Sequence, residues 1–95
     1  MKESLIESYF VKLCKEQGLL QYKFTSPARR SVPDRLLIHN GKAVFIEFKA
    51  TGAKPTVKQQ AEHKKLTDAG CEVFIIDSKE GVDNLLFFSL NIDKR

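Results

Sequence analysis

The pair Asn40-Gly41 constrains the fold of this chain more than any other feature of its sequence. Runs of β-forming apolar residues lie on both sides of the pair. An Asn-Gly pair in this setting predicts a two-residue type I′ hairpin, because both central positions need a positive φ. We therefore expect two antiparallel strands, over roughly 34–39 and 42–49. The second strand has apolar residues on both faces, which is typical of a central strand.

The hairpin sets a register that places two carboxylates against each other. If Asn40 and Gly41 form the loop, Asp34 lies opposite Glu47, and Lys49 follows on the same face. Side chains that face each other directly on a sheet have Cβ atoms roughly 4.5–5.5 Å apart. Two like charges at that distance destabilise a sheet unless a cation lies between them. The register thus outlines a metal site.

Charge is concentrated in the middle of the chain. The net charge of the 95 residues is +4, but residues 21–65 alone contain ten basic and three acidic side chains. A basic zone of this kind suits a polyanion, most commonly a nucleic acid. The alternative is an ordinary basic surface, and charge alone does not separate the two.

Length and composition predict a single intracellular domain over residues 1–95. An apolar content of 42% is enough for one modest core. No stretch has the ~18 apolar residues of a membrane span, and the first residues have no signal-peptide pattern. Cys14 and Cys71 lack metal or disulfide spacing, so we interpret them as small apolar residues.

The remaining pattern predicts a mixed α/β fold, with a central sheet flanked by α-helices. Thr56 and Gln59 have the spacing of a capping box. The expected order is a helix, three strands, a helix, a strand of buried type, a short helix and a last edge strand. These elements cover roughly residues 2–17, 20–25, 34–39, 42–49, 57–69, 72–76, 79–85 and 86–90. Residues 91–95 are expected to form a flexible tail.

The Asp34–Glu47 pair would supply hard oxygen ligands to a metal ion. Asp34 and Glu47 favour Mg²⁺ or Mn²⁺ over zinc, and the backbone carbonyl of Phe48 is a candidate third ligand. Lys49 is the nearest charged group, placed to orient a water or to neutralise a phosphate-centred transition state. The competing interpretation is a cross-strand salt bridge, in which Lys49 only neutralises a carboxylate.

Beyond these residues, the sequence resembles a known nuclease family. Pro33-Asp34 followed by Glu47-x-Lys49 is the signature of the PD-(D/E)xK superfamily, whose core is that of restriction endonucleases. The resemblance extends to the opening Glu-Ser-x-Ile-Glu, the Ser-Pro-Ala-Arg-Arg-Ser-Val loop and Lys-Pro-Thr-x-x-Gln59. Over roughly residues 3–80 the chain looks like a stand-alone VRR-NUC (virus-type replication-repair nuclease) domain. It is also similar to Holliday junction resolvases.

The resemblance implies roles for five residues. Asp34 and Glu47 match metal-binding carboxylates, and Lys49 matches the catalytic lysine. Glu7 matches the helix carboxylate that reaches the metal through water, and Glu3 competes with it for that role. Gln59 matches a glutamine that positions the lysine or a phosphate, a role compatible with its place in the capping box. His39 and His63 are assigned no catalytic role.

The expected partner is DNA. Basic and hydroxyl side chains near the motif are candidates for phosphate contacts. They are Ser26, Arg29, Arg30, Arg35, Lys54 and Lys58, and Lys64 and Lys65 extend the set. For each lysine, a solvated position is the competing interpretation.

The resemblance implies a Mg²⁺- or Mn²⁺-dependent endonuclease of DNA repair that acts on branched DNA such as Holliday junctions. Two incisions are needed to resolve a junction and a domain of this size has one site, so a symmetric homodimer is expected. Stand-alone domains of this type are common in phages, which suggests the cytoplasm of a bacterium or of a phage-infected host. The alternatives are a less selective endo- or exonuclease, a nuclease subunit of a repair or restriction complex, and a non-catalytic DNA-binding module.

Overall fold

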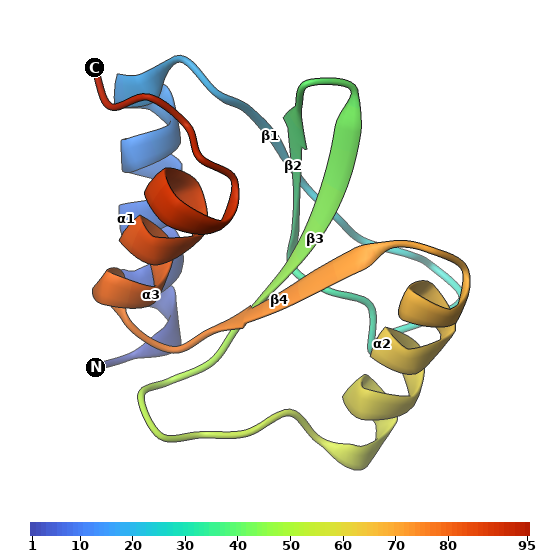
Figure 1. Ribbon diagram of the computed structural model, residues 1–95. Helices are drawn as coiled ribbons and strands as arrows, with labels where there is room; N and C mark the ends of the chain where they lie inside the picture. The colour runs from blue at the N-terminus through green and yellow to red at the C-terminus, as the bar shows by residue number, and fades with distance from the viewer.

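A four-stranded mixed sheet forms the centre of the computed structural model, which describes residues 1–95 (Figure 1). The strands are β1 (Leu20–Lys23), β2 (Arg35–His39), β3 (Lys42–Phe48) and β4 (Glu72–Ile76), and they lie in that order across the sheet. β1, β2 and β3 are antiparallel neighbours, whereas β4 runs parallel to β3. The sheet is therefore mixed, and β3 is a central strand, as the sequence predicted.

The β2–β3 hairpin has the expected loop and register. Asn40 and Gly41 adopt φ values of 51° and 75°, both in the left-handed region that a type I′ turn requires. Leu36 pairs with Phe45, and the ladder ends at the pair of Arg35 with Ile46. Asp34 lies one residue beyond the paired strand, alongside Glu47. The two-residue loop and the hairpin register predicted from it are therefore confirmed.

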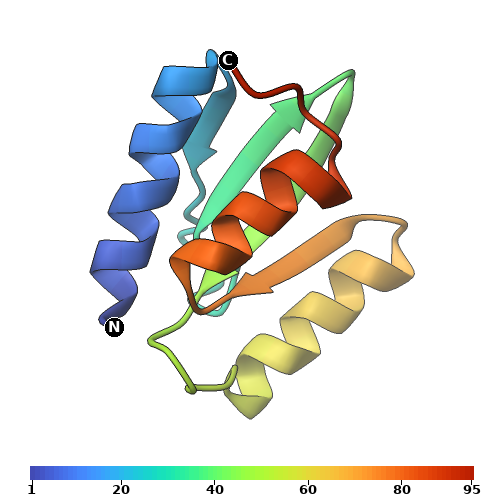
Figure 2. The ribbon, with the colours of Figure 1, turned by 60° about the vertical axis from the view of Figure 1, so that its left-hand side comes forward.

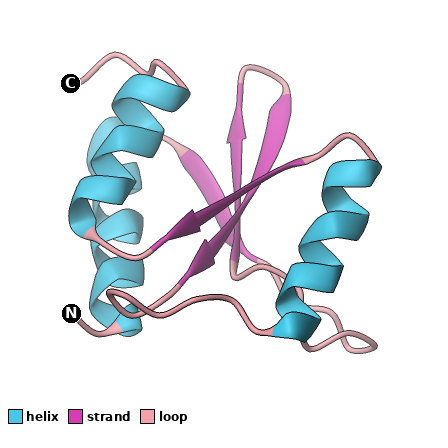
Figure 3. Cartoon of the chain, turned by 60° about the horizontal axis from the view of Figure 1, so that its bottom comes forward, coloured by secondary structure: helices cyan, strands magenta, loops and turns pink.

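Three α-helices cover the sheet on two sides. Helix α1 (Glu3–Gln17) and helix α3 (Lys79–Asn84) lie together over one face, and α2 (Val57–Asp68) lies on the other side (Figures 2 and 3). The Tyr9 hydroxyl of α1 donates a 2.6 Å hydrogen bond to Asp83 of α3. None of the helices is both long and apolar enough to cross a bilayer.

The main core fills the space between the sheet and the α1–α3 layer. Alternate residues of β3 point into it, and the Phe48 ring lies 5.4 Å from that of Phe10 on α1. The other β3 positions, including Phe45 and Glu47, face the α2 side. The buried cluster comprises Ile6, Phe10, Leu13, Cys14, Leu37, Val44, Ile46, Phe48, Ile76, Val82, Leu85, Leu86 and Ile92.

Helix α2 begins where its cap predicts. The Thr56 hydroxyl accepts a hydrogen bond from the Gln59 backbone, and the Gln59 side chain accepts one from the Thr56 backbone. These reciprocal bonds satisfy two of the free N–H groups at the helix start. The helix is mostly polar, and Glu62 and His63 are its buried residues. Gln59 and Leu66 are half-buried on the same side.

Two expectations for the C-terminal third were wrong. Residues 86–90 form no edge strand, because the segment Leu85–Ser89 continues α3 as a turn of π-helix. Val82, Leu85 and Leu86 have helical spacing and are all buried against the core, which a short apolar run alone does not distinguish from a strand. β4 in turn is an edge strand rather than a strand of buried type, and of its residues only Ile76 is buried.

Residues 91–95 make specific contacts, in contrast to the expected flexible tail. Ile92 is 8% exposed and belongs to the core cluster, and its amide donates to the Leu86 carbonyl. The Arg95 amide donates a 2.7 Å hydrogen bond to Gln17 of α1. The apolar side chain of Ile92 thus folds the end of the chain back onto the helices.

The π-helical segment makes a prediction that separates it from a strand. In a strand, Leu86 and Phe88 would share one face, but here Leu86 is fully buried and Phe88 is 76% exposed. We expect Leu86→Ala to lower the free energy of unfolding by about 2–5 kcal/mol. Phe88→Ala should change it by no more than about 0.5 kcal/mol. Urea denaturation measures both, and equal losses would contradict the helical assignment.

Candidate active site

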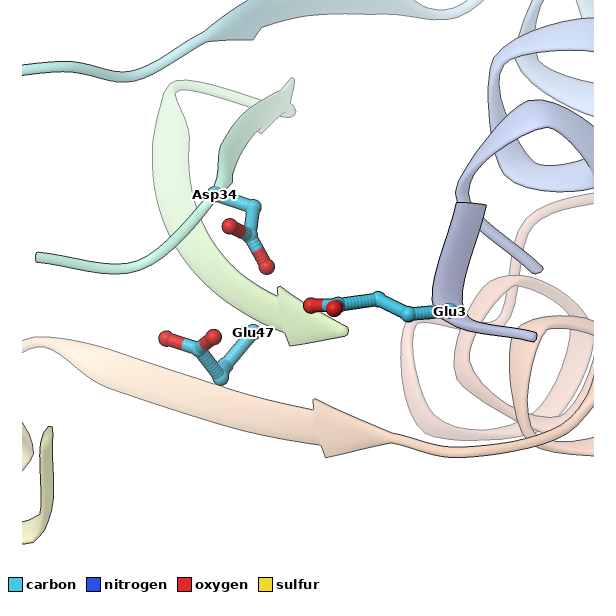
Figure 4. A group of neighbouring side chains, drawn as sticks. All are labelled: Glu3, Asp34 and Glu47. Atoms are coloured by element: carbon cyan, nitrogen blue, oxygen red, sulfur yellow. The ribbon is translucent and has the colours of Figure 1, made fainter. Parts of the chain in front are cut away.

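Three carboxylates from separate segments meet beyond the open end of the β2–β3 hairpin. Glu3 extends from the first turn of α1, Asp34 from the residue before β2 and Glu47 from β3 (Figure 4). One carboxylate oxygen from each residue lies within 4.8 Å of the others. Oxygen atoms this close, on groups that are negative when ionised, form a candidate cation site.

Glu47 is the buried member of this cluster, and helix α2 holds its carboxylate. Its residue is 1% exposed. Gln59 Nε2 donates to Glu47 Oε2 at 3.2 Å, and His63 Nε2 lies 3.4 Å from Glu47 Oε1. Each carboxylate oxygen therefore has a partner on α2. Gln59 performs its capping role at the same time, because its side-chain oxygen bonds to the Thr56 backbone.

His63 is a site residue that the sequence analysis missed. The sequence pattern assigns it no role, because no metal-ligand spacing surrounds it. A signal was nevertheless present, because His63 follows Gln59 by four residues and so shares its side of α2. Any helix side that directs Gln59 toward Glu47 also directs His63 there.

Asp34 is oriented by the backbone of the facing strand. Its Oδ2 atom accepts a 2.7 Å hydrogen bond from the Phe48 amide, and its own amide donates to the Ile46 carbonyl. Pro33, which precedes it, is buried. These contacts fix the orientation of the Asp34 carboxylate beside Glu47. The proposed role of the Phe48 carbonyl as a metal ligand stays a prediction.

The structure brings Glu3, and not Glu7, to the other two carboxylates. The Glu7 Oε2 atom accepts a 2.8 Å hydrogen bond from Arg35 Nε and lies 3.6 Å from Lys23 Nζ. Glu7 is thus neutralised by two cations on the α1 side of the sheet. Glu3, one helical turn earlier, is the exposed carboxylate that reaches Asp34 and Glu47. The geometry thus places Glu3 rather than Glu7 in the cluster, and the role of either residue at a metal stays a prediction.

Lys49 follows β3 and lies beside the acidic cluster without pairing to it. Its positive charge opposes the rise of the Glu47 pKa and helps to lower the pKa of His63. None of the seven ion pairs in the structure includes Lys49. The cross-strand salt bridge considered as an alternative is therefore absent, and the ammonium is left available to a ligand.

Burial and like charge perturb the titration of this cluster. Burial is the main cause that raises the pKa of the Glu47 carboxyl to about 8, and the neighbouring Asp34 carboxyl and the charge of Glu3 act in the same direction. Burial also lowers the pKa of His63, so the imidazole is neutral at pH 7. Glu47 thus holds a proton at neutral pH when no cation is present.

A divalent cation fits this donor set. Three carboxylate oxygens can converge on one ion, and the buried Glu47 carboxyl forms no ion pair with Lys49. Oxygen-only ligation suits Mg²⁺ and Mn²⁺. A cation between Asp34 and Glu47 would replace the proton on Glu47. The neutral His63 ring can then donate Nε2–H to the ionised carboxylate.

Two adjoining surface hollows lead away from the cluster and are lined mainly by polar and basic residues. The first runs from Asp34 past Lys23, Phe24, Thr25, Ser26 and Val32 to Arg29 and Arg30. The second shares Arg29 and Arg30 and continues over Ser31, Lys58, Ala61, Glu62 and Lys65. Together they form a basic path between Asp34 and helix α2, which we call the loop–α2 path.

The other expected DNA contacts are placed differently. Arg29 lies on the path but donates a 3.2 Å hydrogen bond to Glu62, so part of its charge is used. Lys54 is exposed in the loop after β3, outside both hollows. Arg35 lies on the α1 face of the sheet, in contact with Glu7. Successive strand residues point to opposite faces, so Arg35 points away from the side on which Asp34 lies, and its role as a DNA contact stays a prediction.

The buried carboxyl of Glu47 makes stability depend on pH. Its pKa is about 8 in the folded protein and 4.5 in an ordinary setting, so the fold binds a proton that the unfolded chain releases. Stability from this group therefore falls as pH rises through that interval. The lowered pKa of His63 acts in the opposite sense, but only below pH 6.5.

Between pH 6.5 and 8, in EDTA, we expect the Tm of the wild-type protein to fall and that of Glu47→Gln to fall less. The amide keeps the hydrogen-bonding shape but cannot ionise. Glu72→Gln, at an exposed carboxylate of β4, is the matched control and should follow the wild type. Calorimetry gives these Tm values, and equal pH slopes for all three proteins would contradict the buried-carboxyl account.

Comparisons with known proteins identify the family of this chain. A scan against models of protein families finds no match. A curated relative from Acyrthosiphon pisum secondary endosymbiont phage 1, named "Putative nuclease p44", is 44% identical over 81 residues, which are 84% of this chain and 87% of the relative. A solved structure described as a VRR_NUC domain has a TM-score of 0.82 at 29% identity, over 93% of this chain and 97% of that one. With this relative, this structure and the Asp34, Glu47 and Lys49 arrangement, the chain belongs to the VRR-NUC family of nucleases.

Proposed function

We propose that this protein is a Mg²⁺- or Mn²⁺-dependent endonuclease that hydrolyses phosphodiester bonds in DNA. The observation that carries the proposal is the convergence of Glu3, Asp34 and Glu47 within 4.8 Å, next to an unpaired Lys49. Burying Glu47 disfavours its charged form, as its raised pKa indicates. A protein that only bound DNA would gain nothing from such a buried carboxyl.

Each residue contributes a defined part of the hydrolysis. A divalent ion held by Glu3, Asp34 and Glu47 would polarise the phosphate and lower the pKa of a nearby water. Gln59 and His63 keep the Glu47 carboxylate in place, and the Phe48 amide does so for Asp34. The Lys49 ammonium can donate to the phosphate oxygens, where negative charge grows in the transition state. Water adds to phosphorus and releases one proton to solvent, the bond to the leaving sugar oxygen breaks, and that oxygen takes up a proton from solvent.

The loop–α2 path supports DNA as the substrate. Arg30 lies where its two hollows meet and forms no ion pair, whereas Arg29 is held by Glu62. A duplex or junction arm laid along this path would bring a phosphate to Asp34. The VRR-NUC family and its likeness to resolvases suggest branched DNA, such as Holliday junctions, and a role in DNA repair. A symmetric homodimer would supply the two sites that junction resolution needs.

Lys49 and Asp34 should be needed for cleavage. We expect Lys49→Ala and Asp34→Ala to lower the cleavage rate of labelled DNA in Mg²⁺ by about 100-fold or more, since each removes a group placed at the scissile phosphate. Lys42→Ala is the matched control, because it removes the same charge at the other end of β3. Equal nicking by all four proteins would indicate a contaminating nuclease and defeat the proposal.

Substrate choice is tested with the wild-type protein alone. We expect a four-way junction to be cut faster than a flap or linear duplex of the same sequence, with paired incisions if two sites act together. Sedimentation analysis of the bound species gives its stoichiometry. Equal rates on all three DNAs would identify a less selective nuclease. Salt-sensitive binding without metal-dependent cleavage would identify a binding module.

Arg30 should contribute to DNA affinity through a phosphate contact. We expect Arg30→Ala to weaken binding to any sequence and to reduce the slope of log affinity against log salt by about 1. Lys12→Ala removes an exposed charge of α1 that lies outside the loop–α2 path and is the control. Fluorescence anisotropy in EDTA measures the affinities at several salt concentrations. An unchanged salt slope for Arg30→Ala would exclude the loop–α2 path as the DNA track.

A further inference from the structure

We propose that the Arg35–Glu7 ion pair is a positioning device, which sets the first turn of α1 so that Glu3 faces Asp34 and Glu47. The inference rests on the proposed metal site and concerns how this chain assembles it. It gives a function to two residues that the sequence placed elsewhere, Glu7 at the metal and Arg35 on DNA.

Glu3 needs an external support because of where it lies. It is the first residue of α1, and helix ends fray because their first N–H groups lack partners within the helix. No side chain caps this end, since Lys2 occupies the cap position without a cap hydrogen bond. A carboxylate on such a turn would be poorly positioned unless something else fixed the helix.

The Arg35–Glu7 ion pair provides that support from β2, the strand that directly follows Asp34. Arg35 Nε donates to Glu7 Oε2 at 2.8 Å, and Arg35 Nη1 donates to Gln21 Oε1 at 3.2 Å. The side chains of Arg35 and Glu7 are only 18% and 19% exposed, which makes this the least exposed Arg–carboxylate contact of the protein. A half-buried, charge-assisted bond of this kind is stronger and better defined than a surface pair.

The position of Arg35 fixes that of Glu3 through Glu7 and the first turns of α1. Glu7 and Glu3 are four residues apart, so they lie one turn apart on the same side of α1. Arg35 follows Asp34 directly, so a shift of one residue moves the other. Strand alternation sends Asp34 toward the metal and Arg35 toward the helix. One short segment thus supplies a ligand and fixes the helix that supplies another.

A second contact holds the chain just before the first turn of α1. The Thr51 amide donates a 3.1 Å hydrogen bond to the Met1 carbonyl, two residues before Glu3. Thr51 in turn follows Lys49 by two residues, and its hydroxyl donates to the Asp77 carbonyl. Glu3 is therefore held between an anchor next to Asp34 and an anchor next to Lys49.

The test measures Mn²⁺ affinity, by EPR of the free ion, in the full chain without DNA. We expect Arg35→Met and Glu7→Gln each to weaken Mn²⁺ binding by about tenfold or more, the range for residues that orient metal ligands. The double variant should be no weaker than either single one. Arg35→Lys keeps the charge and should recover part of the affinity. Lys12→Met and Glu16→Gln disrupt an exposed pair of the same helix and should have no effect.

The decisive comparison uses a chain that lacks the Glu3 carboxylate. If the pair acts through Glu3, Arg35→Met should weaken Mn²⁺ binding in the wild type but not in Glu3→Gln. An equal loss in both backgrounds would overturn the inference, as would no loss in either. The Tm in EDTA, measured for every variant, shows that each is folded. A wild type that neither binds Mn²⁺ nor cleaves DNA would overturn the proposed function, and this inference with it.

Discussion

The burial of Glu47 opposite Asp34 is the constraint on which the rest of the site depends. A carboxyl that is 1% exposed on a central strand, beside a second carboxyl, is unfavourable in its charged form. The surroundings compensate in one consistent way: α2 supplies partners for both Glu47 oxygens, and the strand backbone supplies one for Asp34. Lys49 remains unpaired beside them. The fold thus holds two carboxyls together in an arrangement whose charged form a cation would stabilise.

The three elements around the sheet each have a distinct part in this arrangement. The β2–β3 hairpin positions the Asp34 and Glu47 carboxylates, α2 orients Glu47, and α1 brings Glu3. The α1–α3 side contains most of the apolar core, so the core cluster and Glu47 lie on opposite faces of β3. β4 pairs with β3 at the edge of the sheet. The Asp77 carbonyl, directly after β4, accepts a hydrogen bond from the Thr51 hydroxyl in the loop that follows β3.

Local chemistry was enough to predict much of the structure. The Asn40-Gly41 loop set the hairpin register, and Thr56 and Gln59 set the start of α2, because each signal acts within a few residues. The choice between Glu3 and Glu7 could not be made this way, since it depends on how α1 docks. Leu86 to Leu90 was ambiguous because an apolar run suits a strand or a buried helix. The orientation of Arg35 was predictable but was missed, because strand alternation already directs its side chain away from that of Asp34.

Anomalous diffraction from crystals grown with Mn²⁺ tests the central claim most directly, because it locates the ion without depending on activity. The account predicts a single strong peak within coordination distance of oxygens from Glu3, Asp34 and Glu47, with Glu7 still bound to Arg35. A peak coordinated by Glu7 in place of Glu3, or no peak at these carboxylates at saturating Mn²⁺, would contradict it.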